Sequence, residues 1–595
     1  MLRVRWLGRV PYDEALVLQT QMHDAIPDGD GYLLLLEHEP VYTLGLRNCE
    51  GDLRLPAGEL GAPIVRAGRG GGITFHGPGQ LVGYPLLPVA WEPDAIPGHV
   101  GRIEQVVIDA LRSLGVRHVG RRDGFPGVWT NPASARGRKI CSVGVRVSKG
   151  RSMHGFALNV TTDMDWFSKI VACGIRDRAV TSLEAEGADL AMGDVVEAII
   201  DAAGRHWGAG GVERQDVVTR VPHPSPAPLS LLEGGGHADS HASSFNGCGT
   251  HLVNRLARAG VDVAAGIDIH TPKPQWLRVK THTGAGFRRV DKLVRELDLV
   301  TVCQEAGCPN IYECWADGTA TFMVNGERCT RRCGFCLVDT RHPAAPDPAE
   351  PGRVAAAVAR MGLTHAVVTT VARDDLPDDG ASTIAATILA VREASPGTTV
   401  EVLISDCKGH EKSLGAIFAA RPDVLAHNVE TVARLQRAVR PNAGYARSLA
   451  VLAAAKRSGL TTKSGLLAGL GETTEEIMGA LADMRSVGVD IVTIGQYLRP
   501  SSQHAPVARW WTPEDFAFIR QYGLAMGFAH VEASPLTRSS YHARRAAVAA
   551  GAASDRSAAS EDAGSAPGGA GGASTTPADV AGSAAVAGTG AVGGA

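Results

Sequence analysis

The sequence predicts an α/β protein of two domains, and three observations lead to this fold class. The chain has 595 residues, which is more than one ordinary hydrophobic core holds. Apolar runs of strand length alternate with helix-like segments in both halves. Between the halves and at the end, Pro, Ser, Gly and Ala replace the large side chains that a core needs. We therefore predict domains over residues 1–215 and 263–545, a linker over 216–262 and a disordered tail over 546–595.

The composition is that of a globular protein without a strongly charged surface. Hydrophobic residues make up 44% of the chain and charged residues 20%, and the net charge is −3. This balance gives no electrostatic reason to expect a nucleic acid as a partner. Charges or glycines interrupt every apolar run, so no membrane partner is expected. The first residues, MLRVRWLGRVPYDEA, lack the long apolar core of a secretory signal, and we expect a cytoplasmic protein.

In the first domain, strand-like runs cover residues 32–38 and 139–147, and helical segments cover 100–114 and 192–206. This mixture is typical of an α/β or α+β domain. From Val221 to about Gly247 the chain is rich in Pro, Ser, Gly and His without a sustained period, which predicts a flexible linker. Cutting the chain there is expected to leave two separately active halves.

The second domain repeats a pattern of short apolar strands and helices. The predicted strands are 319–326, 364–371, 399–405, 423–429, 461–470, 490–496 and 528–533, and the predicted helices include 353–361, 381–394, 446–458 and 474–487. Strands that are apolar throughout and alternate with helices indicate a parallel (β/α) barrel or an open parallel sheet.

Cysteines are clustered in the second domain. Six of the 11 cysteines lie between residues 303 and 336. In a reducing cytoplasm, clustered cysteines are metal ligands or catalysts far more often than disulfides. Cys329, Cys333 and Cys336 have the spacing C-x3-C-x2-C, and three thiolates on a tight loop can bind three corners of a [4Fe–4S] cluster. A zinc knuckle on an interaction scaffold is the alternative, and it would want a fourth protein ligand.

This loop, CTRRCGFC, resembles the radical S-adenosylmethionine superfamily. The resemblance implies that S-adenosylmethionine binds the open iron of the cluster and is cleaved to a 5′-deoxyadenosyl radical. Upstream, CQEAGCPNIYEC adds a second triplet, Cys303, Cys308 and Cys314. Together with KPQWLRVK, VARDDLPDDGA, HNVETV, KSGLLAGLGET, QYLRPS and RSSYHA, it resembles the lipoyl synthase family over residues 270–545.

The lipoyl synthase resemblance implies a partial (β/α) barrel and a second [4Fe–4S] cluster that donates sulfur. It implies that a serine of RSSYHA, Ser540 with Ser539 as the alternative, is the fourth ligand beside Cys303, Cys308 and Cys314. An oxygen ligand leaves a sacrificed iron more easily than a thiolate does. A helix-capping pair is the other interpretation of these serines. Asn428 and Glu430 follow a predicted strand, where barrel ligands gather, and could equally be solvated loop residues.

Two glycine-rich segments mark the first domain. The stretch RGGGITFHGPGQ (69–80) lacks the Gly-Lys-Ser/Thr ending of a P-loop, and alone it is weak evidence for a site. With KICSVGVRVSKGRSMHGFALNV (139–160) and ACGI (172–175), it resembles the octanoyl-[carrier protein]:protein N-octanoyltransferase family, which is related to the biotin and lipoate ligases. The resemblance covers residues 5–215 and implies a biotin/lipoate protein ligase-like α/β domain.

The octanoyltransferase resemblance assigns roles to a cysteine and a lysine. Cys173 matches the thiol that accepts the octanoyl group, and Lys139 matches its partner, which would lower the thiol pKa and shuttle the proton. The acyl-binding positions correspond to Arg69, Gly70, Gly71, Gly72, Ile73, Thr74, Phe75, His76, Ser142, Val143, Gly144, Gly155, Phe156 and Ala157. Cys49 and Cys141 are expected to be small buried apolar residues, which is also the alternative for Cys173.

The two resemblances describe consecutive reactions, because the octanoylated lysine made by the first domain is the substrate of the second. They imply as partners octanoyl-acyl carrier protein, lipoyl domains of 2-oxoacid dehydrogenases, the glycine cleavage H protein, and an electron donor such as flavodoxin or ferredoxin. The implied cofactors are two [4Fe–4S] clusters and S-adenosyl-L-methionine. An ATP-dependent lipoate ligase is the alternative for the first domain; it would need ATP and Mg²⁺ but no catalytic cysteine.

Overall fold

The computed structural model describes residues 1–26, 29–46, 50–90, 92, 94–172, 179–217, 250–279, 284–305, 308–316 and 321–552. The described residues do not include Cys49, Cys173, the predicted linker residues 221–247 or the tail from 553 onward. Met1–Ala553 form one compact unit that contains both predicted domains.

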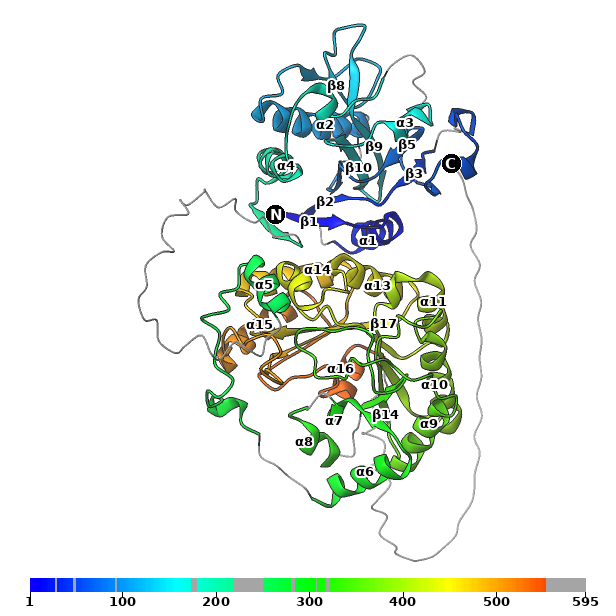
Figure 1. Ribbon diagram of the computed structural model, residues 1–595, viewed down its shortest axis with the longest axis vertical. Helices are drawn as coiled ribbons and strands as arrows, with labels where there is room; N and C mark the ends of the chain where they lie inside the picture. The colour runs from blue at the N-terminus through cyan, green and yellow to red at the C-terminus, as the bar shows by residue number, and fades with distance from the viewer. Residues whose placement is uncertain are drawn as a thin grey trace, which may run out of the picture. The chain divides into compact units, whose positions relative to one another are not determined.

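The first domain is built on a mixed sheet of eight strands in the order β11-β1-β2-β6-β10-β9-β8-β7 (Figure 1). Its strands are β1 (Leu2–Arg9), β2 (Gly31–Glu37), β6 (Gln80–Leu86), β7 (Val119–Gly120), β8 (Val128–Thr130), β9 (Arg138–Ser148), β10 (Arg151–Asn159) and β11 (Val212–Asp216). β1 runs parallel to β2 and β11, and the other neighbours are antiparallel. The predicted strands 32–38 and 139–147 correspond to β2 and β9.

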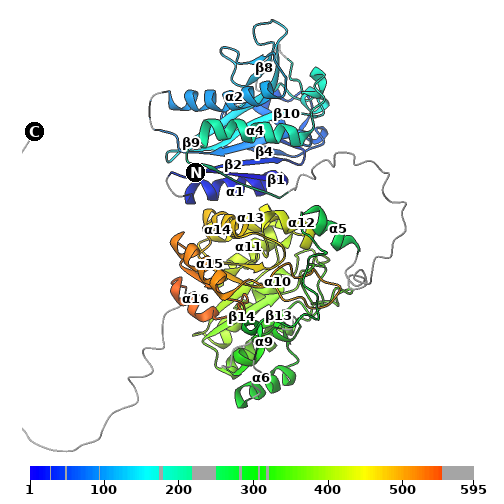
Figure 2. The same cartoon turned by 90° about the vertical axis from the view of Figure 1, so that its left-hand side faces the viewer.

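Helices cover both faces of this sheet. Alternation along β2 places Leu33 and Leu35 in one apolar cluster with α2 (Ala95–Ser113) and α4 (Met192–Trp207). Tyr32, Leu34 and Leu36 point to the opposite face, where α1 (Tyr12–Ala25) packs (Figure 2). A small sheet of β4 (Ile64–Arg66), β3 (Val41–Leu44) and β5 (Ile73–His76) and the short helix α3 (Asp165–Ser168) complete the domain.

The second domain has an eight-stranded sheet in which the strands follow in chain order. The strands are β12 (Val300–Thr301), β13 (Thr321–Val324), β14 (His365–Thr370), β15 (Thr399–Leu403), β16 (Val424–Ala426), β17 (Thr461–Ala468), β18 (Ile491–Gln496) and β19 (His530–Ala533). β12 is antiparallel to β13, and every later pair is parallel. Within the described residues β12 and β19 each have one neighbouring strand, so the sheet is open, as expected for the predicted partial (β/α) barrel.

The helices of the second domain connect these strands. They are α6 (Ala285–Glu296), α7 (Val302–Glu305), α8 (Ile311–Ala316), α9 (Glu350–Met361), α10 (Ala381–Ala394), α11 (Glu411–Ala419), α12 (Gln436–Val439), α13 (Tyr445–Arg457), α14 (Thr474–Ser486) and α15 (Pro513–Ala525). Two of them begin with reciprocal capping boxes, Thr473 with Glu476 and Thr512 with Asp515. Such boxes satisfy backbone N–H groups that the first helical turn leaves free.

Two helices extend into segments that were predicted as linker and tail. α5 (Thr250–Arg258) lies within the predicted linker 216–262, and its Leu252 and Leu256 are buried in the core. α16 (Ala543–Ala549) continues past residue 546, where the tail was predicted to begin, and packs Ala546 and Ala547 against Val424. Small side chains can fill a narrow space in a core, which composition alone does not reveal. No helix in the described ranges is long and apolar enough to cross a membrane.

Candidate functional site

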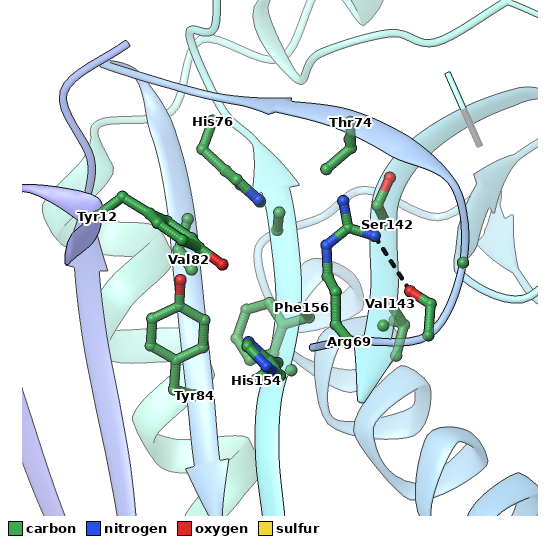
Figure 3. A pocket seen from close by; sticks show the side chains of 15 residues that line it. Tyr12, Arg69, Thr74, His76, Val82, Tyr84, Ser142, Val143, His154 and Phe156 are labelled. Atoms are coloured by element: carbon green, nitrogen blue, oxygen red, sulfur yellow. Dashed lines mark hydrogen bonds between the residues drawn. The ribbon is translucent and has the colours of Figure 1, made fainter. Parts of the chain in front are cut away.

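A pocket in the first domain collects most of the residues predicted to bind the acyl chain (Figure 3). It encloses about 470 Å³ of empty space, part of it open to solvent. Its lining residues come from α1, β5, β6, β9, β10 and the loop before β5. They are Tyr12, Arg69, Gly70, Gly71, Thr74, His76, Val82, Tyr84, Ser142, Val143, Gly144, His154, Gly155, Phe156 and Ala157. Segments far apart in the chain therefore meet around one slot.

Three predicted residues do not line this pocket. Along β5, side chains alternate, so Thr74 and His76 face the pocket while Ile73 and Phe75 are fully buried in a separate apolar cluster. Gly72 contributes a carbonyl oxygen that accepts a hydrogen bond from Arg69 at 2.8 Å. The second layer around the slot therefore contains Ile73, Phe75 and Gly72, which do not face it.

Glycines allow the backbone segments around the pocket to pack closely against one another. A Cβ atom on Gly155 would lie 2.2 Å from the carbonyl oxygen of Gly83, and one on Gly83 would lie 2.2 Å from the Phe156 ring. On Gly144, a Cβ would come within 3.0 Å of the carbonyl oxygen of Gly70. A side chain at Gly155 or Gly83 would clash with these atoms, and one at Gly144 would crowd the 69–72 loop, so the close packing around the slot favours glycine.

Arg69 holds the glycine-rich loop in place. Its guanidinium donates to the carbonyl and hydroxyl oxygens of Thr43 at 2.6 and 2.7 Å. It also donates to the carbonyl oxygen of Gly70, the contact dashed in Figure 3. The side chain is predicted to bind substrate; in this structure its guanidinium contacts Thr43 of β3 and the carbonyl oxygens of Gly70 and Gly72, so it fixes the shape of the slot.

A chain of buried hydrogen bonds runs from Thr43 through His76. The hydroxyl of Thr43 lies 3.2 Å from His76 Nε2, and His76 Nδ1 lies 2.8 Å from Gln80 Oε1. The Gln80 amide donates to Asn159, whose own amide donates to the carbonyl oxygen of Thr181. Because the Gln80 nitrogen is committed as a donor, His76 Nδ1 carries the proton in this arrangement. Burial holds the pKa of His76 well below its usual value, so the ring is neutral.

Four lining residues were not predicted: Tyr12, Val82, Tyr84 and His154. His154 adopts a left-handed backbone conformation, φ +58°, and burial with nearby Arg69 lowers its pKa to about 4. Its backbone N–H donates to the Gln19 side chain of α1. A left-handed backbone conformation is uncommon for histidine and often marks a functional site. It is visible only in the structure, so no signal in the sequence could have found His154.

Lys139 is buried, and its Nζ atom contacts a backbone carbonyl oxygen and an aromatic ring. Its Nζ atom donates to the carbonyl oxygen of Pro126 at 2.9 Å and lies 5.2 Å from the centre of the Trp129 ring. Its backbone is hydrogen-bonded to Ala179 and Thr181. These residues follow the segment 173–178, which lies outside the described residues, so the distance between Lys139 and Cys173 stays a prediction. Cys141 is fully buried in an apolar cluster, as predicted, and burial raises its pKa.

The three cysteines of the predicted radical loop lie close together after β13. Burial raises the pKa of Cys333, and it raises that of Cys336 to about 12, with the neighbouring cysteines adding to both shifts. Arg331, inside the loop, forms ion pairs with Asp374 at 2.8 Å and Asp406 at 2.6 Å. The loop is therefore anchored to the ends of β14 and β15, and its thiols gather at one edge of the sheet.

The second cysteine triplet contacts the C-terminal segment that carries Ser540. Burial and the neighbouring Cys303 raise the pKa of Cys308, while Arg538 opposes the shift. The side chain of Asn310 donates to the carbonyl oxygen of Leu536 at 2.8 Å, and Tyr541 donates to Glu313 at 3.3 Å. Segments more than 200 positions apart are thus side by side, which the resemblance implied and residue spacing did not show.

Ser539 and Ser540 precede the N-terminus of α16. Ser539 accepts a hydrogen bond from the Asn428 side chain at 2.7 Å. The N-cap of α16 is His542, and it makes no side-chain capping bond. Neither serine therefore occupies the N-cap position, which removes the capping interpretation for this helix.

Asn428, Glu430 and Ser539 line a second pocket at the carboxyl ends of β16, β17 and β18. It has about 240 Å³ of empty space, part of it open to solvent, and its other lining residues are Gly465, Leu466, Leu467, Thr493, Gly495, Thr537 and Arg538. Glu430 has a left-handed backbone, φ +71°, and burial raises its pKa against the effect of Arg440. Ligands of (β/α) barrels bind at this edge, which favours a functional role for Asn428 and Glu430.

The donor sets fit iron–sulfur clusters. Each triplet offers three sulfur ligands, the soft donors that such clusters require. Cys329 and Cys333 lie near enough to Cys336 to raise its pKa, and Cys303 lies near enough to Cys308 to raise that of Cys308. In the part of the chain that the structure describes, no three His, Cys, Asp or Glu side chains converge as a single metal ion would require.

Comparisons with known proteins match both domains. Residues 11–204 match the model of the lipoyl protein ligase A/B catalytic domain, and residues 323–484 match that of the radical SAM superfamily. A lipoyl synthase from Rubrobacter xylanophilus is 55% identical over 273 residues, which are 46% of this chain and 85% of the relative. One from Mycobacterium ulcerans is 54% identical over 273 residues, with 46% and 84% covered.

Among solved structures, a bipartite lipoate protein ligase from Thermoplasma acidophilum superposes with a TM-score of 0.31 at 19% identity, covering 36% of this chain and 85% of that one. The family matches bear out the two-domain α/β fold class. They support the N-terminal domain as a ligase or transferase of lipoyl or octanoyl groups without separating these two chemistries.

Proposed function

The chain belongs to the lipoyl synthase family, and from this premise we propose that it builds a protein-bound lipoyl group in two consecutive reactions. The N-terminal domain transfers octanoyl from acyl carrier protein to the lysine of a lipoyl domain. The radical SAM domain then inserts sulfur at C6 and C8 of that chain. The proposal for the first reaction rests on the slot that the 69–72 loop forms with β9 and β10.

In the first reaction, the Cys173 thiolate attacks the octanoyl thioester carbonyl, and the thiolate of the carrier protein leaves. The amine of the acceptor lysine then attacks the new thioester, loses a proton, and releases Cys173. Lys139 is suited to move that proton, because its buried Nζ is held by Pro126 and Trp129 rather than by a carboxylate. The apolar walls of the slot, Val82, Val143 and Phe156, suit an eight-carbon chain.

In the second reaction, Cys329, Cys333 and Cys336 would hold one [4Fe–4S] cluster with S-adenosylmethionine, and Cys303, Cys308 and Cys314 would hold the other. When bound, these groups supply the electron, the radical that removes hydrogen, and the sulfur. The protein's residues position the chain: Asn428, Glu430 and Thr493 offer polar contacts in the pocket, and Leu466 and Leu467 offer apolar ones. Arg331 keeps the radical loop against the barrel through its two ion pairs.

The partners and the compartment follow from the same proposal. The acceptors are lipoyl domains of 2-oxoacid dehydrogenases and the glycine cleavage H protein, and the electron donor is of the flavodoxin or ferredoxin type. An ATP-dependent lipoate ligase is the second candidate for the first domain, because the matching family model is that of the lipoyl protein ligase A/B catalytic domain. A cytoplasmic location is proposed with these partners.

The test supplies octanoyl-acyl carrier protein, an apo lipoyl domain, a reductant and S-adenosylmethionine to the anaerobically purified chain. We expect the acceptor's mass to rise first by one octanoyl group and then by the replacement of two hydrogens by two sulfurs. The octanoyl step should proceed without ATP. A requirement for ATP would establish the ligase, and zinc without iron and sulfide would leave only a scaffold.

Lys139→Met is expected to slow both formation and transfer of the octanoyl adduct about 100-fold, the usual contribution of general acid–base catalysis. Intact-protein mass spectrometry in a rapid-quench series measures both steps. Lys169→Met is the matched control, because Lys169 Nζ also donates to a carbonyl oxygen and lies over an indole ring, at 2.9 Å from Leu60 and 4.3 Å from the Trp166 centre. Equal rates in the two variants would exclude Lys139 from proton transfer.

A further inference from the structure

Helices α13 and α14 are buried around nearly their whole circumference. Nine of the 13 residues of α13 and eight of the 13 residues of α14 are buried. A helix on the outside of a (β/α) barrel normally buries one face and leaves the other in water. In this chain α1 of the first domain contacts both helices, and β11 contacts α14.

The covering surface is apolar on both sides. From the first domain it includes Leu18 and Met22 of α1 and Leu34 of β2, which belong to a single cluster with Leu449 of α13 and Leu481 of α14. The cluster is continuous across the two domains. Neither face could be left in water without exposing large apolar area, which favours association.

A buried ion pair crosses this surface. Arg5 of β1 donates through Nε to both carboxylate oxygens of Asp483 of α14, at 2.9 and 2.8 Å, and each side chain is only 2–3% exposed. Tyr32 of β2 and Tyr445 of α13 donate to the same carboxylate at 3.3 and 3.0 Å. In the second domain alone Asp483 would lose Arg5 and Tyr32, whereas in the first domain alone Arg5 would keep Glu213 of β11 at 2.9 Å. In the intact chain Arg5 and the two tyrosine hydroxyls together satisfy the buried Asp483 carboxylate.

The two domains are also complementary in shape and in further polar contacts. Gly479 of α14 leaves room for Gln215 of β11, since a Cβ on Gly479 would lie 1.5 Å from the Gln215 amide. That amide donates to the carbonyl oxygens of Glu475 and Glu476. At the other end, Glu14 of α1 pairs with Arg447 of α13 at 2.7 Å.

We propose that the outer face of α13 and α14 is a docking surface for the sheet and helix α1 of the same chain's first domain, with Arg5 and Asp483 fixing the register. The linker's composition predicted separable halves; the interface leads us to expect halves that stay together after cleavage. Docking also supports the acyl slot, because α1 contributes Tyr12 to the slot and accepts the His154 backbone hydrogen bond through Gln19.

The test places a specific protease site between residues 221 and 247 of the full-length chain and cuts it after purification. We expect the two wild-type fragments to co-elute in size-exclusion chromatography as one 1:1 species at micromolar concentration. Asp483→Ala leaves the Arg5 charge buried and should weaken association roughly 100-fold. Hydrogen exchange should then become faster in α1 of the cut variant. Gly479→Glu should separate the fragments by a different route, by blocking Gln215 and adding charge beside Glu213.

Lys149→Ala is the control, because it removes one partner of an exposed ion pair, Lys149 with Asp24, away from the docking surface. Asp483→Leu combined with Arg5→Met should restore co-elution, since an apolar pair of similar volume replaces a buried ion pair without large loss. Circular dichroism of each uncut variant shows whether it folds. Wild-type fragments that elute apart would overturn the proposal, as would an Asp483→Ala chain that behaves like Lys149→Ala.

Discussion

Replacing Cys173 by alanine is expected to abolish the octanoyl thioester on the protein and to reduce octanoyl transfer to the lipoyl domain at least about 1,000-fold. Without a nucleophile, the slot can still bind the acyl chain, but no covalent intermediate divides the reaction into two easier steps. The adduct is measured by intact-protein mass spectrometry after brief exposure to octanoyl carrier protein.

Cys141→Ala is the matched control for this prediction. Its thiol is fully buried in an apolar cluster, and burial raises its pKa, so it is a poor source of thiolate. The control should retain the adduct at the wild-type rate. An adduct that persists in Cys173→Ala and disappears in Cys141→Ala would reverse the assignment, and normal ATP-dependent transfer by Cys173→Ala would favour the ligase.

Ser540→Ala is expected to retain the radical cluster and cleavage of S-adenosylmethionine while losing sulfur insertion. The physical reason is that a hydroxyl or alkoxide ligand releases iron more easily than a thiolate, so its removal affects the cluster that must give up sulfur. The structure supports the proximity, because Leu536 and Tyr541, on either side of Ser540, contact Asn310 and Glu313 beside the second cysteine triplet.

Three measurements separate the outcomes for Ser540→Ala: iron and sulfide content, 5′-deoxyadenosine produced, and acceptor mass. Ser539→Ala serves as the neighbouring control, because Ser539 accepts a hydrogen bond from Asn428 and is expected to affect the pocket rather than the cluster. Wild-type lipoyl formation by Ser540→Ala would show that this hydroxyl is not a ligand. Loss of sulfur insertion in Ser539→Ala alone would move the assignment by one residue.

Much of the fold was predictable because its signals are local. The parallel strands β13 to β18 are short apolar runs between helices, and all were expected within a few residues of their observed bounds. The ends of the domains were less predictable. Leu252 of α5 and Ala546 of α16 are buried by residues distant in the chain, and no local pattern shows such burial.

The candidate sites show the same division. The sequence alone identified the two cysteine triplets as candidate cluster ligands, since such ligands in a tight loop are closely spaced, and it identified the glycine-rich loop, since the backbone there must approach other strands closely. Only the tertiary structure decided that Tyr12, Tyr84 and His154 complete the lining of the first-domain pocket, that Asn428 reaches Ser539, and that Arg5 meets Asp483. Those contacts join elements far apart in the chain, and their energy depends on desolvation and packing that no short segment contains.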